Sequence, residues 1–120
     1  MSTQEYSVNL HRHPDGEQTT ATVRDFSLEL GSKAGDLSVG FNPVETLLSA
    51  AGACITSSLG LVARNSNVTI EDMKVSAHAT RESDPPHVSA AELEVSISSP
   101  AEDDKLERIF RIAGRASTVV

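Results

Sequence analysis

The chain has 120 residues, a net charge of -7, three Phe, one Tyr and no Trp, which is the size of one domain. It lacks the basic surface and the aromatic side chains that bind phosphates and stack on bases, so we expect no nucleic-acid partner. We find no secretory signal and no run approaching the roughly 20 apolar residues of a membrane span. With a single cysteine, which suits a reducing compartment, the chain is predicted to be cytoplasmic.

The first third of the chain alternates apolar and polar residues, as β-strands do. Val8 and Leu10 share one face of a first strand, and residues 14–16 predict a turn after it. A second strand is predicted over residues 19–30. Its apolar phase changes beside Arg24, which indicates a bulge there. The simplest outcome is a hairpin.

A polar, glycine-containing loop over residues 31–40 precedes a predicted helix. Asn42 suits the N-cap, Pro43 the first helical position, and Glu45 the third, where its carboxylate can bond the cap amide. An apolar stripe at helical spacing predicts the core-facing side of this helix. Its members are Val44, Leu47, Leu48, Ala51, Ile55, Leu59 and Val62.

Two further strands are predicted over residues 67–80 and 87–98, joined by a loop. A second helix is predicted to open at Ser99, with Pro100 in its first position. The order is therefore ββαββα. This order predicts an α+β fold, in one domain over residues 1–120, with antiparallel strands and two helices.

Cys54 lies beside the apolar stripe of the first helix, among residues smaller than Val. One interpretation is a small buried hydrophobe, which is a common role for a free cysteine. The other is a reactive thiolate, which needs partial exposure and a nearby positive charge. The sequence pattern alone leaves both open.

Glu45 is explained as a helix-start residue. It is nine residues from Cys54, or about 13 Å along a helix axis and on the opposite side. One straight helix cannot bring the two together, so a shared site would need a partner chain or a kink. His11 and His13 share a strand face without a third ligand, so we expect no metal site, and nothing indicates a cofactor.

The stretch NPVETLLSAAGAC, residues 42–54, resembles the peroxidatic-cysteine helix of the OsmC/Ohr family, the osmotically inducible and organic hydroperoxide resistance proteins. The resemblance implies antiparallel sheets packed on a central cysteine-bearing helix, in an intertwined homodimer with active sites at the subunit interface. It places Cys54 at the peroxidatic position, where an arginine and a glutamate are expected nearby. The candidates are Glu45 and either Arg12 or Arg24.

The family's second, resolving cysteine corresponds to Ser117 here, and the strand that closes the family's fold is not found after it. The resemblance implies reduction of a small organic hydroperoxide by Cys54, with an external thiol as reductant. Two alternatives remain. One is a non-catalytic dimer that binds a small apolar ligand in the interfacial cavity, and the other is a purely structural dimer.

Overall fold

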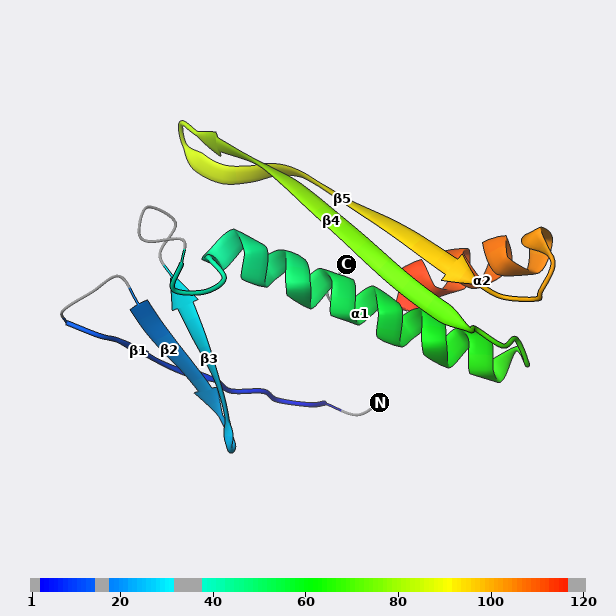
Figure 1. Ribbon diagram of the computed structural model, residues 1–120, viewed down its shortest axis with the longest axis horizontal. Helices are drawn as coiled ribbons and strands as arrows, with labels where there is room; N and C mark the ends of the chain where they lie inside the picture. Colours follow the sequence, from blue (N-terminus) through cyan, green and yellow to red (C-terminus); the bar gives the residue numbers. More distant parts are fainter. Residues whose placement is uncertain (1–2, 15–17, 32–37, 117–120) are drawn as a thin grey trace. The chain divides into compact units, whose positions relative to one another are not determined.

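The structure is a computed structural model that describes residues 3–14, 18–31 and 38–116. It forms two compact units, Met1–Thr46 (the N-terminal unit) and Leu47–Val120 (the C-terminal unit), which are described in turn. The described elements, labelled in Figure 1, are β1 (Asn9–Arg12), β2 (Gln18–Val23), β3 (Phe26–Gly31), α1 (Pro43–Asn65), β4 (Asp72–Ser83), β5 (Pro86–Ser98) and α2 (Asp103–Ala116).

The N-terminal unit contains a three-stranded antiparallel sheet in the order β1-β2-β3. Leu10, Ala21 and Leu28 lie opposite one another across the three strands. They share one face because side chains alternate between the faces of a sheet. Ala21 is buried, but Leu10 is 60% exposed and Leu28 61%. The apolar face of this sheet is therefore largely uncovered within the N-terminal unit.

The predicted bulge beside Arg24 is wrong, because the chain reverses there. β2 and β3 are separate strands joined by a tight turn at Arg24 and Asp25. Arg24 has a φ of 52°, the left-handed conformation that two-residue hairpin turns require. The order is thus βββαββα, with one more strand than predicted. The expected β1–β2 hairpin is confirmed by the pairing of Leu10 with Ala21, although residues 15 and 16 of its predicted turn lie outside the described part.

The start of α1 confirms the predicted capping box. The backbone amide of Glu45 donates to Oδ1 of Asn42 at 2.8 Å, and the amide of Asn42 donates to Oε1 of Glu45 at 2.9 Å. Two amides that lack partners within the helix are satisfied in this way. The cap therefore determines where α1 begins.

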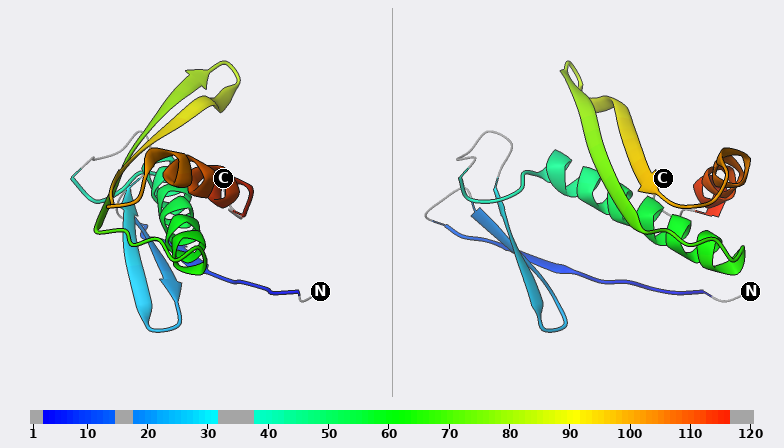
Figure 2. Two further views of the ribbon diagram at one scale, coloured as in Figure 1. Left: turned by 90° about the vertical axis from the view of Figure 1, so that its right-hand side faces the viewer. Right: turned by 45° about the vertical axis from the view of Figure 1, so that its right-hand side comes forward.

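In the C-terminal unit, the β4–β5 hairpin and α2 supply the core that packs on one side of α1. Leu59 and Ala113 are fully buried, and Ile109 is 2% exposed. Figures 1 and 2 show β4 beginning near the C-terminal end of α1, with α2 beside the same end. The half-buried side chains around this core come from all four elements, and include Val62, Val75, Leu93, Val95, Leu106 and Phe110.

α2 begins at Asp103, four residues after its predicted cap at Ser99. The hydroxyl of Ser99 donates to the carbonyl oxygen of Thr69 at 2.6 Å and accepts from the amide of Ala101 at 3.2 Å. Because Ser99 is bonded to a residue 30 positions away, it closes a turn before the helix. The helix then starts where the amide of Leu106 bonds the carbonyl of Glu102.

Among the described residues, α1 is long and apolar enough to cross a membrane by length and composition, with a mean hydropathy of 1.6. The expectation that no run approaches this length was therefore wrong. Small residues such as Gly52 and Ser57 interrupt the apolar residues of this helix, but the mean hydropathy over the whole window remains high. One such helix is weak evidence for a membrane span, because the core helix of a soluble protein meets the same criterion.

Candidate functional site

The helix α1 places Cys54 beside the protein core but not in it. The next residue, Ile55, is buried, and Leu59, one turn further, is fully buried. Cys54 itself is half-buried, because successive helical side chains are rotated by about 100°. Its thiol thus has an apolar core on one side and remains partly accessible on the other.

Two leucines flank Cys54 on the same side of α1. Leu47 and Leu61 stand seven residues before and after it, which is two turns in each direction, so the three residues share a face. Leu47 is 53% exposed and Leu61 55%. We call Leu47, Cys54 and Leu61 the thiol stripe. The prediction that Leu47 faces the core is wrong, because the elements packed on α1 cover only the side of Ile55 and Leu59.

The surface of α1 around Cys54 consists of small residues. At Gly52 an added Cβ would lie 3.7 Å from Val75 and 4.0 Å from Leu93, which are ordinary contact distances. The β4–β5 hairpin therefore packs over Gly52, but this packing would also accept alanine. Ala50 and Ala53 are exposed instead. Their small size leaves room for another molecule to approach the helix on the side of Cys54.

Glu45 and Cys54 belong to the same continuous helix. Nine residues separate them by about 13 Å along the axis. The carboxylate of Glu45 accepts the hydrogen bond from the Asn42 amide, so its position has a structural explanation. α1 is not broken between the two residues, and it does not itself bring this carboxylate to the thiol.

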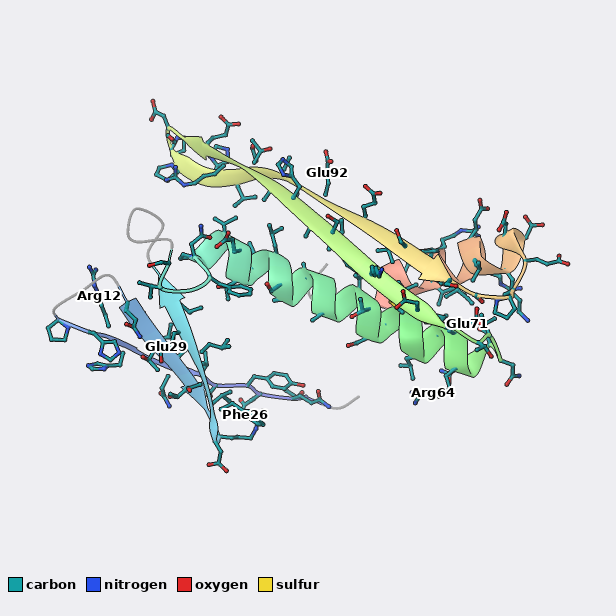
Figure 3. All side chains as sticks on the ribbon, viewed as in Figure 1. Arg12, Phe26, Glu29, Arg64, Glu71 and Glu92 are labelled. Carbon is teal, nitrogen blue, oxygen red and sulfur yellow. The ribbon has the colours of Figure 1, made fainter. Side chains whose placement is uncertain are left out.

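The two candidate arginines belong to the N-terminal unit, whereas Cys54 belongs to the C-terminal unit. Arg12 is the last residue of β1 and pairs with Thr19 of β2; its side chain is labelled in Figure 3. Arg24 lies in the β2–β3 turn, where its guanidinium carbon is 5.7 Å from the centre of the Phe26 ring. Neither arginine therefore lies in the same compact unit as Cys54. Ser117, at the expected resolving position, lies outside the described residues.

The sequence did not reveal a polar network on the N-terminal sheet. Nε2 of His13 lies 2.8 Å from Oγ1 of Thr20, which donates to Oε2 of Glu29 at 2.9 Å, and Gln18 also donates to Glu29. The hydrogen bonds from Gln18 and, second, from Thr20 lower the pKa of the Glu29 carboxyl. The strand register brings the network together, because Thr20 lies opposite Glu29 and Gln18 shares the face of Thr20; no sequence pattern marks that register. Among the described residues no group of three metal-binding side chains exists.

A shallow hollow of about 560 Å³ lies near the C-terminal end of α1. Its floor includes Ala63 and Val68, and its rim carries Arg64 and Glu71, both labelled in Figure 3. Cys54 does not line this hollow. Arg64 also has an ordinary role in the last turn of the helix, where a cation interacts favourably with the helix dipole.

Solved structures share this architecture. An OsmC-like protein from Mycoplasma pneumoniae has a TM-score of 0.90 and 20% identity, over 98% of this chain and 86% of that one. An organic hydroperoxide resistance protein from Legionella pneumophila has a TM-score of 0.76 and 16% identity, over 98% and 88%. One from Elizabethkingia anophelis has a TM-score of 0.74 and 14% identity, over 97% and 86%. At these identities, the likeness shows the fold.

No curated protein sequence matches the chain. The family model described as "OsmC-like protein" matches residues 31–120, a range that includes Cys54 and both helices. The expected α+β fold with antiparallel sheets is confirmed by the strand pairing and by the neighbouring structures. The chain belongs to the OsmC-like protein family.

Proposed function

We propose that this OsmC-like protein is a thiol-dependent peroxidase that reduces organic hydroperoxides through Cys54. The observation that carries the proposal is the thiol stripe, in which a half-buried cysteine stands between two exposed leucines on the central helix. These leucines lie about 10 Å from Cys54 along the helix axis, so they would contact the organic group of a peroxide and not the thiol itself, which favours an organic peroxide over hydrogen peroxide. The family assignment supports the same chemistry, because two structural neighbours are named organic hydroperoxide resistance proteins.

In the first half-reaction, the Cys54 thiolate attacks one oxygen of the hydroperoxide. A sulfur–oxygen bond forms while the oxygen–oxygen bond breaks, and the leaving alkoxide takes a proton to become an alcohol. The sulfur is oxidised to a sulfenic acid and the peroxide is reduced. An arginine beside the thiol would stabilise the thiolate and the developing negative charge. We assign this role to Arg12 or Arg24, supplied by either subunit of a dimer.

The second half-reaction needs an external thiol, because Cys54 is the single cysteine of the chain. One external thiol attacks the sulfenic sulfur, which forms a mixed disulfide and releases water. A second thiol then attacks the external sulfur of that disulfide and regenerates Cys54. We propose a small dithiol as the reductant, since its second thiol is already in place. A cytoplasmic location, with its reducing thiols, is part of the proposal.

We propose that the functional protein is a homodimer. The single chain exposes apolar side chains on α1 and on one face of the N-terminal sheet, such as Leu47, Leu61 and Leu28. Exposed apolar surface of this kind marks an interaction site. A second subunit would exclude water from the thiol stripe and complete the pocket for the organic group of the peroxide.

One observation favours a second candidate function, a non-catalytic dimer that binds a small apolar ligand. Ser117 stands where the family's resolving cysteine is expected, so no disulfide within the chain can protect the sulfenic acid from further oxidation. In this case Cys54 contributes packing, and its thiol reacts as slowly as an ordinary surface cysteine.

The rate of Cys54 oxidation distinguishes the two candidates. We would compare cumene hydroperoxide with hydrogen peroxide on the unmodified chain and on a variant that combines Cys54→Ser with Ser58→Cys. The control moves the thiol by one turn along the same side of the helix, to another half-buried position. The peroxidase proposal expects fast oxidation at Cys54, a preference for the organic peroxide, and loss of both in the control. Equal, slow rates in both proteins would support the binding function.

A further inference from the structure

The outer surface of α2 carries charges in a self-complementary order. Asp104, Glu107, Arg108 and Arg111 are all exposed, and their helical positions fall within one stripe about 100° wide. Along this stripe the two acids come first and the two arginines second. We call these four residues the α2 charge stripe. The helix is drawn from orange to red in Figure 2.

Opposite charges are available within the helix, since Asp104 and Arg108, and likewise Glu107 and Arg111, are four residues apart, a spacing that permits ion pairs. The described chain nevertheless contains no ion pair or hydrogen bond from any of these four side chains. The apolar side of α2 is used by the core, through Ile109 and Ala113. The charge stripe is therefore the side of α2 that is free to meet another molecule.

We propose that the α2 charge stripe is a contact surface for a second copy of this chain, with the two α2 helices antiparallel about a two-fold axis. If the axis passes between Glu107 and Arg108, Glu107 of each copy faces Arg108 of the other. Asp104 of each copy then faces Arg111 of the other. Symmetry makes four ion pairs from four residues. A parallel, in-register arrangement would place like charges together, so the order of charges selects the antiparallel one.

Charge also determines how strong this contact is. Each pair is exposed, and exposed ion pairs contribute little individually and are weakened by salt. Two chains of net charge -7 repel each other at long range, but salt of about 0.1 M screens that repulsion beyond about 10 Å. The contact is therefore weak, forms at high protein concentration, and is lost in concentrated salt. It lies on a different helix from the thiol stripe and does not depend on peroxidase activity.

The experiment is sedimentation equilibrium of the full chain at about 1 mM, a concentration that populates contacts of only about 4 kcal/mol. An acid-only variant combines Arg108→Glu with Arg111→Glu, and a base-only variant combines Asp104→Arg with Glu107→Arg. A control with the same charge change as the acid-only variant combines Lys74→Glu with Arg81→Glu on β4. Circular dichroism checks that each variant keeps its helices. The measured quantity is the average molar mass in solution, with no peroxide present.

At about 0.1 M salt, we expect the average mass of the unmodified chain and of the β4 control to exceed the mass that each has at low protein concentration. This excess mass should be lost at about 1 M salt. Each stripe variant alone should have a dissociation constant about tenfold higher or more, while their equimolar mixture should regain the excess mass. A mixture no heavier than its two components would overturn the proposal. An unmodified chain whose mass does not depend on salt would also overturn it.

Discussion

Leu59 and Leu61 offer a matched test of which side of α1 is covered. Leu59 is fully buried and Leu61 is 55% exposed, although they are only two positions apart. Leu59→Ala removes the equivalent of about three buried methylene groups, or about 2.4 kcal/mol of transfer free energy. The cavity left behind raises the expected loss of unfolding free energy to about 3 to 5 kcal/mol. Leu61→Ala should cost about 1 kcal/mol or less, because Leu61 is already half in water.

Urea unfolding followed by circular dichroism measures both losses. Leu and Ala have similar, high helix propensities, so a change in helix formation does not obscure the comparison. The measurement is made at low and high protein concentration, because a partner that covers Leu61 would transfer its contribution to dimer association. A loss for Leu61→Ala as large as that for Leu59→Ala, at a concentration where the chain is monomeric, would refute the placement of the thiol stripe on the open side.

Three other predictions concern the N-terminal unit and the start of α1. Gly40→Ala should lower the unfolding free energy by about 1 to 3 kcal/mol in urea unfolding, because its Cβ would overlap the carbonyl oxygen of Glu29. Unchanged stability would show that this close approach is relieved easily. Asn42→Ala removes the cap of α1 and should cost about 1 kcal/mol, measured by the same method with Asn42→Ser as the conservative control. For Glu29, hydrogen bonds from Gln18 and Thr20 lower the pKa of the carboxyl in the folded state, so its contribution to stability is present above its ordinary pKa of 4.5 and is lost as the pH falls through the lowered value. Stability should therefore fall more steeply on acidification for the unmodified chain than for Glu29→Gln, and parallel curves would contradict this.

The parts of the fold that depend on local signals could be predicted from the sequence. The start of α1 was predicted because Asn42, Pro43 and Glu45 are close in sequence and satisfy helix-end amides among themselves. The start of α2 was not, because Ser99 bonds the distant carbonyl of Thr69. That bond depends on tertiary structure and leaves no local pattern. Serine followed by proline looked like a helix start although it closes a turn.

The turn at Arg24 shows why one strand was missed. A change of apolar phase is produced equally by a bulge and by a tight hairpin. Hairpin turns are recognised by Gly or Asn, which adopt positive φ easily, but Arg24 adopts a φ of 52° without being either. The stacking of its guanidinium on Phe26 is a contact that appears only once the strands are paired.

The position of Cys54 in the chain could be recognised from the sequence, but its surroundings could not. The apolar stripe predicted for α1 was too wide, because periodicity does not tell how much of a helix is covered by other elements. Ile55 and Leu59 are covered and Leu47 is not. Proximity of Arg12 or Arg24 to the thiol would depend on contacts between distant parts of the protein, which spacing along the chain does not encode.

The most direct test of the proposed function is a single turnover at Cys54. The reduced protein is mixed with one equivalent of cumene hydroperoxide without any reductant, and the alcohol product and the intact protein mass are measured together. We expect one alcohol per subunit and the gain of one oxygen atom at Cys54, with neither in Cys54→Ser. Peroxide that remains unconsumed, with an unchanged protein mass, would contradict the assignment of Cys54 as the peroxidatic residue.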